Sequence, residues 1–251
     1  MAKKIIDVVL YNGEKFLLDI RREILKDVVD LFIVKEGNTT FSGLPRDLFV
    51  SDQENTETEV IEFPEHLDTW GRDRYQRGYI LDLEQYGVDD DWIVLTSDLD
   101  EVPDPKALAW LKDNFDNDEI YSFEQTMFQY FLNVVNTSEP WAGTRGCSLE
   151  KYKHIDAETM RQRRDQCTIL EDAGWHWSFL GGKEMIEKKI KSYAHQEYNN
   201  EFILNDIHSR MNQNKDVFER GFELKTVKID DSFPEYIVDN QDKLAKYIKK
   251  V

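Results

Sequence analysis

The stretch IIDVVLYNGEKFLLDIRREILKDVVDLFIV, residues 5–34, contains two short apolar runs separated by an amphipathic segment. Residues 5–10 and 31–34 have the length and composition of buried strands. Between them, apolar residues recur at the spacing of one helical face, namely Leu17, Ile20, Ile24 and Val28. A crossover of this kind joins parallel strands. The stretch therefore predicts an α/β fold built on a parallel sheet.

The remainder of the chain continues this alternation of strands and helices. Apolar runs and turn residues predict further strands at 58–63, 92–96, 120–135 and 174–182. Helical spacing predicts helices at 70–87, from Pro105 to 115, at 183–195 and at 239–251. No linker or internal repeat interrupts the pattern. We expect a single domain, residues 1–251, with a mixed, mostly parallel sheet flanked by helices.

The composition limits the classes of partner. The chain has 251 residues, 40% of them apolar, and a formal net charge of −18, which argues against binding to nucleic acid or to an anionic membrane. The apolar run near the start, residues 5–10, is too short for a signal peptide core or a membrane span. With only two cysteines, Cys147 and Cys167, and no metal-type spacing between them, we expect reduced thiols and a cytoplasmic location.

Three acids follow the strand predicted at 92–96. The sequence WIVLTSDLDEVPDP, residues 92–105, places Asp98, Asp100 and Glu101 between that strand and a helix capped by Asp104. Residues two apart in an extended stretch project to the same side about 6.6 Å apart, so Asp98 and Asp100 converge on one site. Two carboxylates at this edge of an α/β sheet suit a hard divalent cation bound together with a nucleotide diphosphate. Glu101 either orients these ligands or faces water.

The same letters allow two other functions. A D-x-D motif after an apolar strand also resembles the haloacid dehalogenase phosphatases, in which Asp98 would be a nucleophile. That motif usually opens its domain, whereas here a strand, helix and strand unit comes first. The third hypothesis is a non-catalytic carbohydrate-binding protein, which would bind sugar without metal and without need of Asp98.

Several separated stretches together resemble glycosyltransferase family 17. They are DVVLYNGEKFLLDIRREIL, VDLFIVKEGNTTFSGLP, WGRDRYQR, SDLDEVP and GWHWSFLGG...KIKSYAHQE, which span roughly residues 5 to 200 in the order and spacing of that family. The resemblance implies a GT-A fold, an inverting transfer from a nucleotide sugar, typically UDP-N-acetylglucosamine, to a carbohydrate acceptor, and Mn²⁺ or Mg²⁺ as cofactor. It also implies that the nucleotide-sugar half of the domain extends to about residue 115 and that the acceptor half begins at about 116. Where many members read Asn-Glu after the first strand, this chain reads Asn12-Gly13-Glu14. We also expect no transmembrane anchor or stem of the kind that the animal enzymes have.

The resemblance also suggests roles for individual residues. For the metal it implies Asp98, Asp100 and, near the end of the helix predicted at 183–195, His195 as a third ligand. The end of the first strand is the usual place for the base and ribose of the donor. That position nominates Tyr11, Asn12 and Glu36, and the arginines of WGRDRYQR are placed against the diphosphate or the acids, namely Arg72, Arg74 and Arg77.

The acceptor side is assigned by chemistry rather than by a motif. Inverting transfer needs a carboxylate that takes the proton of the attacking hydroxyl. Asp172, at the entry of the strand predicted at 174–182, is the first choice, and Glu124 and Glu171 are alternatives. His176 either contacts the substrates or packs in the core. Trp141 is a candidate for stacking on a sugar ring.

Overall fold

The computed structural model of the chain describes residues 3–51, 53–138 and 140–251, with the backbone alone at Asp165. It confirms the strand, helix and strand unit at the start of the chain. Strand β1 (Lys4–Tyr11) is followed by helix α1 (Lys15–Leu25) and by strand β2 (Leu31–Gly37), which pairs with β1 in parallel. Helix α1 buries Leu17, Leu18 and Ile20 against the sheet, as the apolar spacing predicts.

The described strands join one mixed sheet, whose main path runs β11-β7-β6-β8-β4-β1-β2-β3. Strands β3 (Thr56–Ile61), β2, β1 and β4 (Trp92–Asp98) are all parallel neighbours. Strand order reverses at β1, because β2 and β3 lie on one side of it and β4 on the other. In open α/β sheets ligands bind outside the carboxyl ends of the strands at this point. Those ends are Tyr11 in β1 and Asp98 in β4.

The second half of the chain adds the antiparallel part of the sheet. Strands β6 (Tyr121–Gln129), β7 (Val134–Asn136) and β8 (Trp141–Ser148) continue from β4 through β8. Strand β10 (Gly174–Ser178) pairs with β6 and with the short β5 (Glu101–Pro103), and β9 (Thr168–Leu170) pairs with β6. The acids predicted in one turn therefore divide, since Asp98 ends β4 and Glu101 begins β5.

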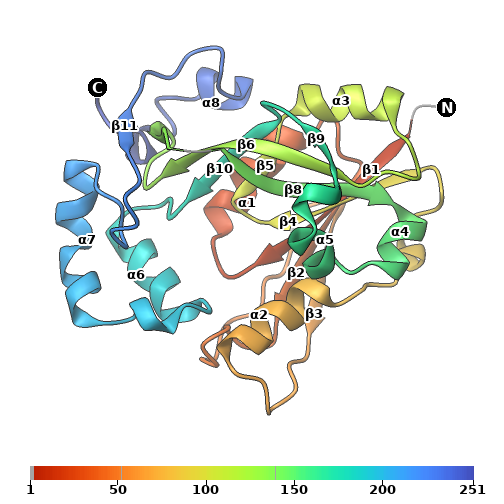
Figure 1. Cartoon of the computed structure of the whole chain (residues 1–251), viewed down its shortest axis with the longest axis horizontal. Coiled ribbons are helices and arrows are strands. Elements are labelled where there is room, and N and C mark those ends of the chain that lie inside the picture. The colour runs from red at the N-terminus through yellow and green to blue at the C-terminus, as the bar shows by residue number, and fades with distance from the viewer. Residues whose placement is uncertain (1–2, 52, 139) are drawn as a thin grey trace.

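The helices cover the sheet and frame its carboxyl edge. In Figure 1, α6 and α7 lie together at the left, while α2 and α5 lie below and in front of the sheet. The helices not yet named are α2 (Thr69–Gly78), α3 (Pro105–Asn114), α4 (Leu149–His154), α5 (Ala157–Gln162), α6 (Lys183–Ser192), α7 (Glu201–Gln213) and α8 (Glu235–Asp239). Helix α3 begins as predicted, with the Asp104 side chain accepting a hydrogen bond from the Lys106 amide. No helix in the described ranges has both the length and the apolar character needed to cross a bilayer.

Two helix predictions are wrong. The helix expected over 70–87 ends at Gly78, and the chain is extended at Tyr79 before a 3-10 turn at Leu83–Tyr86. The helix expected over 239–251 is absent, because α8 ends at Asp239 and only a 3-10 turn at Ala245–Tyr247 follows.

Residues 221–251 pack onto the main core rather than extending away from it. Strand β11 (Leu224–Thr226) pairs with β7, and the side chains of Phe233, Ile237 and Leu244 are buried in the cluster that contains Trp175. Asn133 fixes the end of this segment. Its side chain donates to the Lys249 carbonyl at 2.9 Å and accepts from the Lys249 amide at 2.8 Å.

Candidate active site

A cavity of about 870 Å³ opens at the reversal point of the sheet. Its floor contains the carboxyl ends of three strands, with Asn12 following β1, Asp98 and Asp100 at β4, and Ser178 at the end of β10. One side is formed by α2, α5 and the residues after α5, and the other by α6 and by residues 193–220. Asp98 and Asp100 thus line one cavity, as the D-x-D spacing predicts, and Leu99 between them is buried in the core.

A buried arginine holds the backbone of these acids. Arg21, on α1, donates from Nη1 to the carbonyls of Glu101 at 2.6 Å and of Asp98 and Leu99 at 3.3 Å each. Its Nε and Nη2 atoms each lie 2.8 Å from the carboxylate of Asp7, and neither side chain is exposed. The turn from β4 to β5 is therefore fixed from inside the protein, independently of any ligand in the cavity.

Asp98 lies between two arginines. Its Oδ1 accepts a hydrogen bond from Arg77 on α2, and its Oδ2 lies 3.3 Å from Arg161 on α5. Burial acts to raise the pKa of Asp98, but the Arg77 and Arg161 guanidiniums outweigh it and hold the pKa below its usual range. Asp98 is consequently ionised at neutral pH while its side chain remains 28% exposed to the cavity.

Asp100 is held by a lysine and a histidine. Lys189 on α6 donates to Oδ2 at 2.7 Å, and the His176 Nε2 atom lies 3.6 Å from Oδ1. Burial again acts to raise the pKa of Asp100, and Lys189 and His176 outweigh it and lower the pKa well below its usual range. Lys189 also lies 3.4 Å from Glu14, so it joins the end of β4 to the start of α1.

Glu101 supports the site from beneath. It is fully buried, so it does not face water. Its carboxylate accepts from the Asp98 amide at 3.1 Å, from Arg161 at 2.9 Å and from the Trp141 indole at 2.7 Å. Trp141 is thereby fixed next to Arg161 and is not among the residues that line the cavity.

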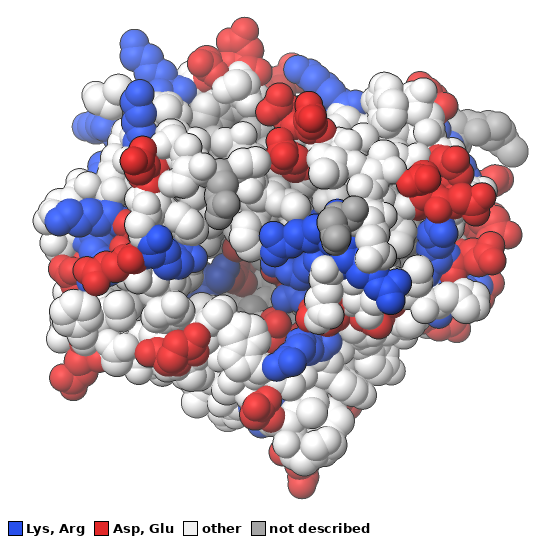
Figure 2. Space-filling view, viewed as in Figure 1, with Lys and Arg blue, Asp and Glu red and all other residues white. Residues whose placement is uncertain are grey.

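Cations gather around this cavity although the chain is strongly acidic. Figure 2 shows basic side chains around a hollow on this face, and the lining includes Arg74, Arg77, Arg161, Arg164, Lys189 and Arg220. Among the described side chains, Arg74 and Arg164 form no ion pair: Arg74 donates to the Trp70 carbonyl, and Arg164 lies over the Trp141 ring. Both guanidiniums line the cavity and are therefore available to an anion that enters it.

The nucleoside candidates from the sequence divide into two groups. Tyr11 and Asn12 line the cavity, and Asn12 donates to the Ser192 hydroxyl at 3.0 Å. Glu36 does not line it, because its buried carboxylate binds Arg46 at 2.9 Å and accepts from the Phe49 amide at 2.5 Å. Glu36 therefore fixes the loop after β2, which packs Phe49 against Tyr11.

The arginines of α2 also have different positions. Arg77 and Arg74 line the cavity, whereas Arg72 donates to the Phe41 carbonyl at 3.1 Å and is outside the lining. Arg77 is the most embedded of the three. Besides Asp98 it contacts Asp73 at 3.1 Å and Glu158 at 3.0 Å, and it thus joins α2 and α5 to the end of β4.

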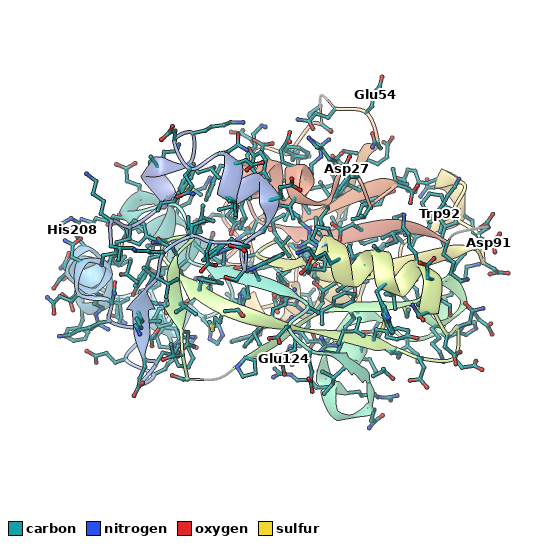
Figure 3. The ribbon with its side chains drawn as sticks, turned by 90° about the horizontal axis from the view of Figure 1, so that it is seen from above. Asp27, Glu54, Asp91, Trp92, Glu124 and His208 are labelled. Carbon is teal, nitrogen blue, oxygen red and sulfur yellow. The ribbon has the colours of Figure 1, made fainter. Side chains whose placement is uncertain are left out.

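The carboxylates predicted as the base lie elsewhere. Asp172 precedes β10, so it lies at the opposite end of that strand from Ser178, and it lines a second cavity of about 1030 Å³ with Asp104 and Trp175. Glu124, which lies on β6 and is labelled in Figure 3, is not among the residues that line the site, and neither is Glu171. The carboxylates that line the site besides Asp98 and Asp100 are Glu14, Asp73 and Glu158.

The residues suit a metal that arrives with its ligand better than a metal held by protein alone. In the described part of the chain, no three His, Cys, Asp or Glu side chains converge as a metal cluster. His195 lines the same cavity, but its Nδ1 lies 2.5 Å from Glu197 and its ring contacts Trp70. Magnesium-type sites commonly use one or two carboxylates and complete their shell with substrate phosphates and water. Asp98 and Asp100 fit that donor set.

Sequence reasoning missed most of the basic residues of the site. Arg161 and Arg164 lie in the polar stretch RQRRDQ, residues 161–166, which has no periodicity that would indicate a site. Lys189 lies on the polar face of a helix that was predicted from its apolar face alone. Arg21 was hidden in the middle of α1, where a charge usually indicates the solvent face. One signal was present for Arg21, since Asp7 interrupts an otherwise apolar strand and requires a buried partner.

A buried lysine beneath α2 gives the first testable prediction. Lys35 on β2 donates to the carbonyls of Arg77 at 3.1 Å and Tyr79 at 2.8 Å, which end α2 next to the site. Burial, with the Arg77 charge, lowers the pKa of Lys35 to about 7. The unfolded chain, with the ordinary pKa of 10.5, binds more protons between pH 7 and 10.5, so the Lys35 contribution to stability rises with pH in that window.

We therefore expect Lys35→Met to change the pH dependence of unfolding. The free energy of unfolding of the wild type, minus that of the variant, should rise by roughly 1 to 3 kcal/mol from pH 7 to pH 9 in urea titrations. Lys15→Met, which removes an exposed lysine of α1, is the matched control and should show no such rise. An equal difference at both pH values would contradict the assignment.

Comparisons with known proteins agree on one family. The family model described as glycosyltransferase family 17 matches residues 1–220. The β-1,4-mannosyl-glycoprotein 4-β-N-acetylglucosaminyltransferases of Homo sapiens and Rattus norvegicus are each 29% identical to the chain over 241 aligned positions. The Mus musculus protein of the same name is 28% identical. Each alignment covers 79% of this chain but only 44% of the relative, so the chain spans less than half the length of these relatives.

Proposed function

Because the chain belongs to glycosyltransferase family 17, we propose that it transfers a sugar from a nucleotide sugar to a carbohydrate hydroxyl. The observation that supports this most directly is the cavity at the β1/β4 reversal, where Asp98 and Asp100 lie in the same lining as Arg74 and Arg164, two guanidiniums that form no ion pair among the described side chains. A nucleotide sugar carries a diphosphate of matching charge. The donor that the relatives' name suggests is an N-acetylglucosamine nucleotide, and we propose UDP-N-acetylglucosamine.

The proposed arrangement places the donor across the strand ends. The base and ribose lie at Tyr11 and Asn12, and the diphosphate lies between the β4 acids and the guanidiniums of Arg74 and Arg164. A Mn²⁺ or Mg²⁺ ion held by Asp98 and Asp100 would supply Lewis-acid stabilisation of the departing diphosphate. Lys189 and Arg161, which contact those acids, add positive charge beside the leaving group without rearrangement. A GT-A fold and inverting chemistry are part of the same proposal.

The proton acceptor belongs to the same cavity. We place it among Glu14, Asp73 and Glu158, because Asp172 and Glu124 lie outside the lining of the site. Asp73 and Glu158 both contact Arg77, at 3.1 and 3.0 Å, whereas Glu14 has only the longer 3.4 Å contact with Lys189. Glu14 is therefore the carboxylate of the three with the weakest ion pair.

Calorimetric titration of UDP tests the proposal. We expect UDP to bind in the presence of Mn²⁺ and at least about tenfold more weakly in EDTA, because the metal joins the diphosphate to Asp98 and Asp100. Uridine, which has no phosphate, is the matched control and should show no dependence on metal. Absence of UDP binding under every condition would remove the main support for nucleotide-sugar chemistry. The same samples would then be assayed for phosphatase activity, which the haloacid dehalogenase alternative predicts with Asp98 as the nucleophile.

A further inference from the structure

One side of the cavity is an aromatic wall, formed by Phe179, Tyr193, His195, Tyr198 and Phe218. Its rings contact one another in sequence. Tyr198 stacks on Phe218 with a centroid distance of 3.9 Å, and Phe218 meets Phe179 edge-on at 5.3 Å. The wall reaches the opposite side of the cavity at Trp70, whose ring is 4.3 Å from that of His195. None of these rings is needed for the diphosphate.

Two polar atoms of side chains that line the same cavity have no hydrogen-bond partner. The Nδ1 atom of His176 and the hydroxyl of Tyr193 are buried and make no hydrogen bond within the described residues, and both side chains line the cavity. His176 is only 7% exposed. Buried polar atoms are normally satisfied, so these two indicate a ligand that supplies hydrogen-bond donors or acceptors.

The cations next to the wall are already neutralised. Lys189 lies over the Phe179 ring and pairs with Asp100 at 2.7 Å, and Arg220 lies over Phe218 and pairs with Asp216 at 2.6 Å. The wall therefore presents rings and hydrogen-bonding groups, while Lys189 and Arg220, the cations described beside it, each pair with a carboxylate. This is the complement of a pyranose, which has an apolar C–H face and a rim of hydroxyls.

We propose that the aromatic wall is the acceptor subsite and that it takes an uncharged pyranose, with Tyr193 and His176 contacting its hydroxyls. The assignment rests on the proposed glycosyl transfer. The base of the nucleotide is another flat ligand of such an enzyme. We place it at Tyr11 and Asn12, because strand order reverses at β1 and ligands bind outside the carboxyl end of the strands at that point. The wall is built from residues after β10, next to Asp100 and therefore beside the proposed site of transfer.

Titration of neutral disaccharides into the UDP-loaded protein tests the subsite. The probes are β-1,4-mannobiose, chitobiose and cellobiose, with calorimetry or saturation-transfer NMR as the readout. We expect at least one to bind, and Trp70→Ala and Phe218→Ala to weaken that binding roughly tenfold. Tyr193→Phe, which removes only the hydroxyl, should weaken it severalfold. Trp110→Ala removes a ring that is 50% exposed on α3 and is the matched control.

The outcomes separate this inference from the proposed function. UDP affinity should stay within about twofold in every wall variant that melts like the wild type. Loss of UDP affinity in those variants, with disaccharide binding unchanged, would make the wall a nucleobase site and overturn the inference. Failure of all three probes to bind would overturn it as well. The disaccharide titrations are also run without nucleotide. If a disaccharide binds and UDP does not, the result counts against nucleotide-sugar chemistry and not against the subsite.

Discussion

Asp98→Asn is expected to lower the rate of sugar transfer by about a thousandfold and to abolish metal-dependent UDP binding. The carboxylate is one of the two proposed metal ligands, and removal of a group that stabilises charge in the transition state costs about a hundred- to a thousandfold. Asp100→Asn should behave in the same way. Calorimetry with UDP and Mn²⁺, followed by transfer assays with UDP-N-acetylglucosamine, would measure both effects.

The control for Asp98→Asn must separate lost chemistry from lost folding. Removal of this carboxylate takes one partner from Arg77, which keeps Asp73 and Glu158, and one from Arg161, which keeps Glu101, so we expect a loss of about 1 to 3 kcal/mol in the free energy of unfolding. The melting temperature of Asp98→Asn, compared with that of the wild type, measures the loss of stability directly. Binding and transfer are then compared at a temperature at which both proteins are folded. A folded Asp98→Asn protein that keeps UDP affinity and transfer within tenfold of the wild type would contradict the site.

Arg21→Met is expected to destabilise the fold by about 3 to 5 kcal/mol, the largest effect on stability that we predict. It leaves the fully buried Asp7 carboxylate unpaired and removes the donor to three backbone carbonyls at the β4–β5 turn. The free energy of unfolding in urea measures this directly. A loss below about 1 kcal/mol would show that the pair is replaceable.

The double variant Asp7→Leu with Arg21→Met distinguishes the two parts of that effect. Because it buries no unpaired charge, it should recover much of the lost stability. Its affinity for UDP should remain lower than that of the wild type, because the Asp98 and Leu99 carbonyls lack their donor and the acids of the site are no longer fixed. Recovery of both stability and UDP binding would limit Arg21 to a role in the core.

The sequence was sufficient for the elements whose pattern is local. The first strand, helix and strand, the capped helix α3 and the apolar strand that ends at Asp98 all have periodicity and boundary residues within about fifteen positions. The helix expected over 70–87 was too long because the apolar spacing continues past Gly78. There the Lys35 ammonium binds the carbonyls of Arg77 and Tyr79, at 3.1 and 2.8 Å, and the helix ends.

The C-terminal prediction was wrong for a tertiary reason. Residues 239–251 have helical composition, but the chain there bonds to distant groups. The Leu132 amide donates to the Tyr247 carbonyl at 2.8 Å, and Asn133 binds the backbone of Lys249. Those contacts join positions more than a hundred residues apart, which no local pattern reports. Tertiary context thus overrides helix propensity in this segment.

The candidate site was predictable where its residues follow the end of a strand or lie in the stretch WGRDRYQR, as Asp98, Asn12 and Arg77 do. Asp98 and Asp100 follow from their position after a strand, whereas their partners Arg161 and Lys189 come from helices 60 to 90 residues later in the chain. The same limit explains Asp172. Its place before a strand was known, but which end of that strand faces the cavity depends on how β10 pairs with β6 and β5.

The packing of residues 221–251 bears on how this family is delimited. The family model stops at residue 220, yet Phe233, Ile237 and Leu244 are buried together with Trp175, which lies within the matched region. The boundary drawn from sequence similarity is therefore not a folding boundary. A protein cut at residue 220 would expose the apolar surface that these side chains cover and would lose the edge partner of β7. Relatives whose sequences diverge after that point need some other segment to cover the same face.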